Sequence, residues 1–208
     1  MAVQEDAVCT NCMLHLPRTG FPAEPYDNEM ARLFFGRLPI ERAAALFFYQ
    51  SGSPASRLIA AMKYSGHPEY AHALGRMMAQ EMADDGFFDG IDLIVPVPLA
   101  RSRQRQRGYN QSQEIACGIA EVTGIPVDAK SVCRVRETES QTTKAGYERT
   151  ENMKDAFRIN GPEKLAHRHL LLVDDVLTTG STVMACAEEI MKAEDVRFSV
   201  LTLGFTKN

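Results

Sequence analysis

The stretch that decides the fold is Leu-Leu-Leu-Val-Asp-Asp-Val-Leu-Thr-Thr-Gly-Ser-Thr, residues 170–182. Its four leading apolar residues predict a central parallel strand that is buried on both faces. Two carboxylates follow, Asp174 and Asp175, and then a short loop rich in hydroxyl groups. A helix is expected next, with apolar residues on one face at Val183, Met184, Ala187, Ile190 and Met191. A loop between a strand end and a helix is where open α/β sheets bind ligands.

The loop after the two aspartates has the composition of a phosphate-binding site. Gly180 lets the backbone come close to a ligand, and the first N–H groups of the following helix are free to donate. Hydroxyl side chains stand beside them at Thr178, Thr179, Ser181 and Thr182. The alternative is a strand followed by an ordinary N-cap, with Thr179 or Ser181 capping the helix.

The acid pair limits what this loop can hold. A phosphate would repel Asp174 and Asp175 if all three contacted the same group, so the carboxylates should face a sugar diol or a magnesium ion carried by the substrate. A ribose with a 5′-phosphate satisfies both requirements. The segment resembles the signature of type I phosphoribosyltransferases, which bind phosphoribosyl pyrophosphate (PRPP). The resemblance implies that the acid pair holds the ribose hydroxyls and that residues 178–182 take the 5′-phosphate.

The length of the chain predicts one substantial domain. Apolar residues make up 45% and charged residues 24% of the 208-residue chain, which is ordinary for a globular protein. The net charge of −4 argues against binding nucleic acid over the whole surface, but it is compatible with a local basic patch. We expect no signal peptide and no membrane span. Five cysteines without the spacing of a disulfide framework indicate a cytoplasmic protein.

Strand and helix patterns alternate along the rest of the chain. Residues 1–40 are irregular, with a short helix expected near Met30–Phe35. Beyond them we expect strands at 44–49, 91–97, 126–135, 169–173 and 196–205, and helices at 53–66, 68–82 and 111–122. This alternation predicts an α/β domain at 41–208, with a mostly parallel, twisted sheet flanked by helices, after the short irregular N-terminal segment. The ligand should lie across the carboxyl ends of the strands that begin near 91 and 169.

A strongly basic segment follows the strand expected at 91–97. It has four arginines at every second position, in what is expected to be a loop: Arg101, Arg103, Arg105 and Arg107. A basic run in isolation is more often a solvated surface loop. Beside a phosphate site, however, guanidinium groups match the geometry of a pyrophosphate. Arg107, which precedes Gly108, is the residue that we expect to serve there.

Three motifs together resemble the ComF/GntX family. They are Val-Pro-Val-Pro at 95–98, Arg-Gly-Tyr-Asn-Gln at 107–111 and Asp-Asp-Val-Leu-Thr-Thr-Gly at 174–180, and the resemblance covers roughly residues 40–205. It implies the type I phosphoribosyltransferase fold and an enzyme similar to amidophosphoribosyltransferases, acting on PRPP with Mg²⁺. Some members of the family are connected with DNA uptake in competent bacteria, and related proteins often form homodimers.

The resemblance also implies roles for residues outside these motifs. The polar stretch 137–155 would be a hood that closes over the site, because an oxocarbenium-like transition state must be shielded from water. Gln141 and Arg149 would then contact PRPP; the alternative is a mobile surface loop without such contacts. Lys63 would meet the pyrophosphate, or it would simply favour the C-terminus of its helix electrostatically.

Cys9-x-x-Cys12 is half of a zinc site. The family usually has two such pairs near the N-terminus, and only the second is recognisable here, with His15 as a candidate third ligand. Either the site has been lost or the chain starts downstream of the natural N-terminus.

Two functions remain open at this point. In the first, a Mg²⁺-dependent phosphoribosyltransferase, Asp174 and Asp175 hold the ribose and its developing charge, residues 178–182 anchor the 5′-phosphate, and Arg107 assists the departure of pyrophosphate. The acceptor is not identified. In the second, a PRPP-sensing or DNA-handling protein keeps the pocket without turnover. The acidic net charge counts against nucleic acid as the partner.

Overall fold

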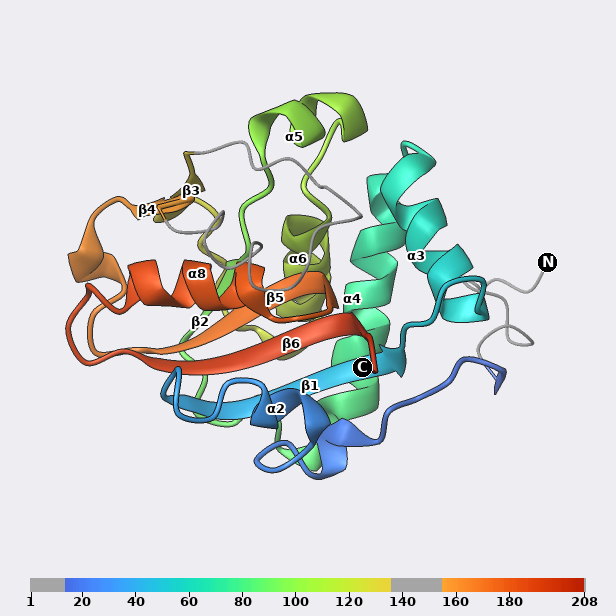
Figure 1. Cartoon of the computed structure of the whole chain (residues 1–208), viewed down its shortest axis with the longest axis horizontal. Coiled ribbons are helices and arrows are strands. Elements are labelled where there is room, and N and C mark those ends of the chain that lie inside the picture. Colours follow the sequence, from blue (N-terminus) through green and yellow to red (C-terminus); the bar gives the residue numbers. More distant parts are fainter. Residues whose placement is uncertain (1–13, 136–154, 208) are drawn as a thin grey trace.

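The computed structural model describes residues 14–135 and 155–207. Their core is a four-stranded sheet in the order β1-β6-β5-β2, and all three neighbouring pairs are parallel. The strands are β1 (Ile40–Phe48), β2 (Leu93–Pro96), β5 (His169–Leu177) and β6 (Arg197–Phe205). This sheet with its flanking helices confirms the predicted α/β class (Figure 1).

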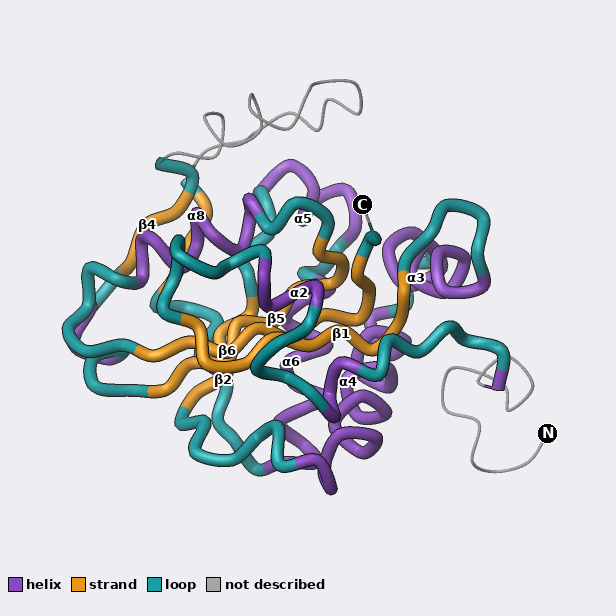
Figure 2. Tube along the Cα trace, turned by 60° about the horizontal axis from the view of Figure 1, so that its bottom comes forward, coloured by secondary structure: helices purple, strands orange, loops and turns teal. Residues whose placement is uncertain are grey.

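Helices cover both faces of the sheet (Figures 1 and 2). The long helices α4 (Pro68–Met82) and α6 (Gln111–Thr123) pack on one face. The opposite face carries α8 (Ser181–Ile190) and the short α2 (Glu29–Arg32). Two further helices follow the carboxyl ends of β1 and β2 along the chain, namely α3 (Pro54–Tyr64) and α5 (Arg101–Arg107). Single 3₁₀ turns lie at Phe21–Ala23, Ala83–Asp85 and Pro162–Lys164.

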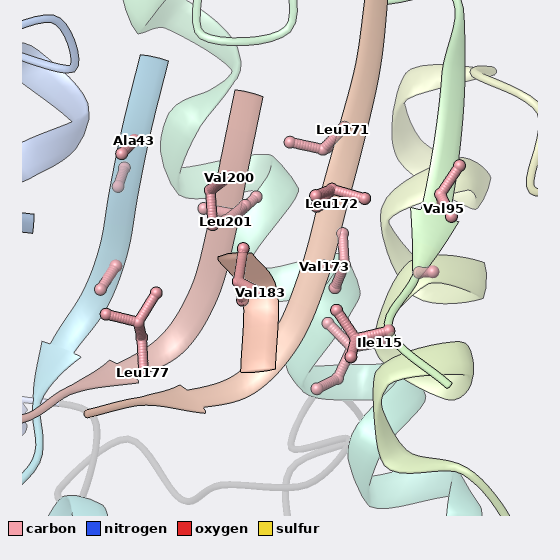
Figure 3. Packing of buried hydrophobic residues seen from close by; sticks show 14 of the residues in the cluster. Ala43, Val95, Ile115, Leu171, Leu172, Val173, Leu177, Val183, Val200 and Leu201 are labelled. Atoms are coloured by element: carbon pink, nitrogen blue, oxygen red, sulfur yellow. The ribbon is translucent and has the colours of Figure 1, made fainter. Parts of the chain in front are cut away.

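The core explains the continuous apolar run that opens the decisive stretch. Each residue from Leu170 to Val173 is fully buried, because β5 lies inside the sheet and is covered on both faces. Figure 3 shows Leu171, Leu172 and Val173 with Val183 of α8 and Ile115 of α6. The predicted apolar face of α8 is confirmed except at its end. Met191 follows the last helical residue and is 38% exposed.

The strand expected at 126–135 is wrong in extent. Only Val132–Arg134 forms a strand, β3, and it pairs antiparallel with β4 (Phe157–Ile159) in a separate two-stranded sheet. A single bridge joins Val127 to Ile94 of β2. The interruption comes from Asp128, whose side chain accepts hydrogen bonds from the backbone N–H groups two and three residues on, so that the chain turns.

The segment before β1 protects the outer edge of the sheet. Phe48 donates a backbone hydrogen bond to the Pro17 carbonyl at 2.8 Å, and Thr19 donates to the Leu46 carbonyl at 3.1 Å. Phe21 is buried nearby, against the rings of Phe48 and Phe205. An edge strand covered in this way cannot pair with another chain.

Candidate functional site

The acid pair lies inside β5, near its carboxyl end. Asp174 is paired in register with Thr202 of β6, and the strand continues to Leu177, beyond the end at Val173 that the sequence suggested. On the other side, Val97 donates a backbone hydrogen bond to the Val173 carbonyl, so the chain leaves β2 beside the two aspartates. This confirms that the segments beginning near 91 and 169 end side by side.

Each carboxylate has its own partner from a neighbouring helix. Ser112 Oγ in α6 donates to Asp174 Oδ1 at 3.0 Å, and Lys63 Nζ in α3 lies 3.0 Å from Asp175 Oδ1. Burial, and then the negative charge of Asp175, raise the pKa of Asp174 to about 7. Ionisation of Asp174 is therefore disfavoured by its burial and by the neighbouring negative charge. A cation or a hydroxyl donor placed between the two acids would favour the charged form.

The raised pKa predicts a pH-dependent cost of folding. An aspartate with a folded pKa near 7 and an ordinary unfolded pKa lowers stability progressively as pH rises from about 4 to 7. Asp174→Asn removes that cost and keeps an oxygen to accept from Ser112. In metal-free buffer we expect the variant to be more stable than the native protein at pH 8, by about 1–2 kcal/mol after solvent screening. Thermal melting at pH 8 and pH 4 measures this; an advantage that fails to shrink at pH 4 contradicts the assignment.

The predicted phosphate loop connects β5 to α8 and begins the helix without a side-chain cap. Gly180 is the N-cap residue, with a φ of 75° that favours glycine, and among the described residues no side chain caps the first N–H groups of α8. The hydroxyls of Thr179 and Ser181 bond to each other at 3.0 Å. The alternative of an ordinary N-cap is therefore wrong. These N–H groups stay available to an anion.

The basic segment forms a helix instead of the expected loop. All four arginines belong to α5, and helical spacing divides them into two pairs. Arg103 and Arg107 are half-buried and line a cavity of about 170 Å³, whereas Arg101 and Arg105 are exposed. From the sequence, Arg107 alone was expected to serve the ligand, and the helix brings Arg103 to the same cavity.

The motif at 107–111 shapes the wall of this cavity. Arg107 lies over the ring of Tyr64 at 5.3 Å and donates to Gln111 Oε1 at 2.8 Å. The Tyr109 hydroxyl donates to the carbonyl of Met62, next to the lysine that pairs with Asp175. Asn110 caps α6 through its side-chain oxygen and donates to the Val97 carbonyl. The motif thus fixes α3, α6 and the end of β2 around one space.

The cavity brings together most of the described residues that the sequence singled out. Asp174, Asp175, Lys63 and Arg107 all line it, and so does Thr182 from the phosphate loop. The other four predicted loop residues do not: Thr178, Thr179, Gly180 and Ser181. The predictions for Gln141, Arg149, Cys9 and Cys12 lie outside the described residues.

Four polar or charged cavity residues were not among the predicted site residues. They are Arg103, Gln111, Ser112 and Arg134. Burial, and then the positive charge of Arg103, lower the pKa of Arg134. Its side chain also lies over the ring of Phe157, which belongs to the partner strand of β3. Arg103 lies one helical turn before Arg107. This spacing is the only signal in the sequence that could have identified Arg103 as a cavity residue.

No group of three or more His, Cys, Asp or Glu side chains is arranged to hold a metal ion in 14–135 or 155–207. Within the same ranges, no helix has both the length and the apolar character that crossing a membrane requires.

The solved structures most similar to the chain include two phosphoribosyltransferase proteins. Glutamine PRPP amidotransferase from B. subtilis is 20% identical, with a TM-score of 0.45 over 68% of this chain and 30% of that chain. Hypoxanthine phosphoribosyltransferase from Trypanosoma cruzi is 15% identical, with a TM-score of 0.40 over 66% of this chain and 68% of that chain.

Similarity in sequence is stronger and extends over most of the chain. No family model matches. The DNA utilization proteins YhgH of Salmonella typhimurium and Escherichia coli K12 are each 33% identical over 179 residues, which are 85% of this chain and 77% of theirs. Competence protein F of Haemophilus influenzae is 32% identical over 143 residues, 67% of this chain and 62% of that one. The chain therefore belongs to the ComF family, which includes competence protein F and YhgH.

Proposed function

We propose that the protein binds PRPP and transfers its 5-phosphoribosyl group to an acceptor, with release of pyrophosphate. The observation that carries this proposal is the meeting of three kinds of group at one cavity. The acid pair belongs to β5, and the two half-buried arginines belong to α5. The third group is the start of α8, which follows the loop after β5. PRPP has the complementary parts, namely a ribose diol, a pyrophosphate and a 5′-phosphate.

The acid pair has the donor chemistry that suits Mg²⁺. This ion is commonly bound through one or two carboxylates and the phosphates of a substrate, so that a full cage of protein ligands is not needed. Burial, and then repulsion by Asp175, raise the pKa of Asp174, and a cation beside the pair would relieve this repulsion. When bound, Mg²⁺ would neutralise charge on the pyrophosphate.

The reaction would break the bond from ribose C1 to pyrophosphate and form one from C1 to the acceptor, which loses a proton. Positive charge develops on the ribose, close to where Asp174 and Asp175 would hold its hydroxyls. Negative charge develops on the leaving group, beside Arg103 and Arg107. Preorganised charges of this kind stabilise a transition state without reorganising during the reaction.

Titration with PRPP and Mg²⁺ tests binding, and release of pyrophosphate in the presence of ammonia or nucleobases tests turnover.

Arg107→Ala should discriminate between the two ends of the substrate. We expect this variant to bind PRPP and inorganic pyrophosphate at least about tenfold more weakly, since a hydrogen bond to a charged group contributes about 1.5–3 kcal/mol. Affinity for ribose 5-phosphate should change much less. Calorimetric titration with the three ligands measures the difference.

Arg101→Ala is the matched control, because Arg101 belongs to the same helix but is exposed and does not line the cavity. Its affinities should equal those of the native protein. An equal loss for all three ligands in Arg107→Ala would refute the assignment of Arg107 to the pyrophosphate.

A second candidate function is a DNA-handling protein that binds PRPP without turnover. Two observations favour it: the names of the relatives refer to DNA utilization and competence, and α5 presents Arg101 and Arg105 to solvent. Exposed arginines attract the phosphates of nucleic acid without reading its sequence. PRPP binding without pyrophosphate release, together with DNA binding that Arg101→Ala weakens, would support this function.

A further inference from the structure

An exposed tyrosine contacts one of the cavity arginines from outside the cavity. Tyr64 is the last residue of α3, and 70% of its surface is exposed. Its ring centre lies 5.3 Å from the guanidinium carbon of Arg107, which is within the range of a cation–π contact. Arg107 lines the cavity, whereas Tyr64 does not. Any effect of the ring on a ligand in the cavity therefore has to pass through the arginine.

Two neighbours together fix the guanidinium group of Arg107. The ring of Tyr64 is one of them, and the other is Gln111, whose Oε1 accepts a hydrogen bond from Arg107 Nη1 at 2.8 Å. A guanidinium group carries five N–H groups, so these two contacts can hold the side chain while it still donates to a pyrophosphate.

The end of α3 is itself anchored by the motif that contains Arg107. Gly108 ends α5 with a φ of 85°, and the chain then places the Tyr109 hydroxyl where it donates to the carbonyl of Met62, in the last turn of α3. Tyr109 is buried, so this contact does not depend on solvent-exposed groups. Each of the two segments thus holds the other, and Tyr64 is in place before a ligand binds.

We infer that Tyr64 is a positioning residue, which holds Arg107 in the orientation that binds the pyrophosphate end of the substrate. A long arginine side chain loses rotamer freedom when it binds a ligand, and a side chain that is already held loses less of it. The inference rests on the proposed function and extends it to a residue outside the cavity wall.

Tyr64→Leu removes the ring and keeps an apolar side chain. Its affinity for inorganic pyrophosphate in Mg²⁺ buffer should fall about two- to fivefold, the effect of losing a cation–π contact at an exposed site. Affinity for ribose 5-phosphate should not change, and the melting temperature should stay within about 2 °C of the native value, because the side chain is exposed. Tyr64→Phe keeps the ring and should bind pyrophosphate as the native protein does. Calorimetric titration measures these affinities.

A double-mutant cycle with Arg107→Ala tests whether Tyr64 acts through Arg107. In the Arg107→Ala background, Tyr64→Leu should weaken pyrophosphate binding no further. A loss of the same size in both backgrounds would mean that Tyr64 affects the ligand without Arg107, and it would overturn the inference.

Tyr26→Leu is the matched control. Tyr26 is 64% exposed, and its ring centre lies 5.9 Å from the guanidinium carbon of another arginine, Arg42. Arg42 does not line the cavity. The control variant therefore loses a contact of the same kind at a different place, and its affinity for pyrophosphate should equal that of the native protein.

The outcomes distinguish this inference from the proposed function. If the native protein binds PRPP and pyrophosphate but Tyr64→Leu binds pyrophosphate as tightly, the role of Tyr64 is wrong and the proposed function stands. If the native protein binds neither ligand, both are wrong. Weaker pyrophosphate binding by Tyr64→Leu that Tyr64→Phe restores, and that disappears in the Arg107→Ala background, supports the inference.

Discussion

Replacing Asp174 and Asp175 together with asparagine should abolish PRPP binding and leave the fold intact. The two carboxylates line the cavity and would hold the ribose hydroxyls and Mg²⁺, and asparagine cannot supply their charge. Each charge-assisted hydrogen bond contributes about 1.5–3 kcal/mol, so loss of both should weaken binding about 100-fold or more. Calorimetric titration in Mg²⁺ buffer measures the affinity, and circular dichroism checks the fold.

The chain offers a matched control for this double variant. Asp84 and Asp85 are also adjacent, but they lie in an exposed 3₁₀ turn and do not line the cavity. Their double replacement by asparagine changes the net charge equally and should leave PRPP affinity unchanged. Unchanged affinity in the Asp174 and Asp175 double variant would overturn the assignment of the acid pair.

Gly118→Ala should destabilise the protein by about 3 kcal/mol or more. In an ordinary helix interior this replacement stabilises, since glycine is a poor helix former. Here a Cβ at Gly118 would stand 2.1 Å from the carbonyl oxygen of His72 and 2.8 Å from the backbone nitrogen of Arg76. Backbone atoms cannot move aside as a flexible side chain can, so α4 and α6 would have to separate.

The Gly118→Ala substitution should also displace residues of the cavity wall, because the first turn of α6 carries Gln111 and Ser112. Denaturant unfolding measures the stability of Gly118→Ala. Val122→Ala, near the exposed end of the same helix, is the control and should cost no more than about 0.5 kcal/mol. A Gly118→Ala variant as stable as the native protein would show that α4 and α6 do not cross as closely as described.

Periodicity and strand order made the centre of the fold predictable. The run Leu170–Val173 has to be buried on both faces, and the parallel sheet that this requires brings the end of β2 beside Asp174. The acids and the phosphate loop are neighbours along the chain. Their joint position therefore follows from local sequence.

The rest of the site depends on tertiary contacts that a linear pattern does not encode. Arg101–Arg107 alternates arginine with polar residues and has no apolar face, so hydrophobic periodicity gave no sign of a helix there. Ser112 and Arg134 reach the cavity from separate elements, α6 and β3. In the predicted strand at 126–135, the local turn made by Asp128 prevailed over β propensity.

The central claim is that this cavity binds PRPP, and calorimetric titration of the unaltered protein with PRPP in Mg²⁺ buffer tests it most directly. We predict saturable binding to one site per chain with micromolar affinity, and much weaker binding once EDTA removes the metal. Absence of detectable binding at millimolar PRPP would contradict the account.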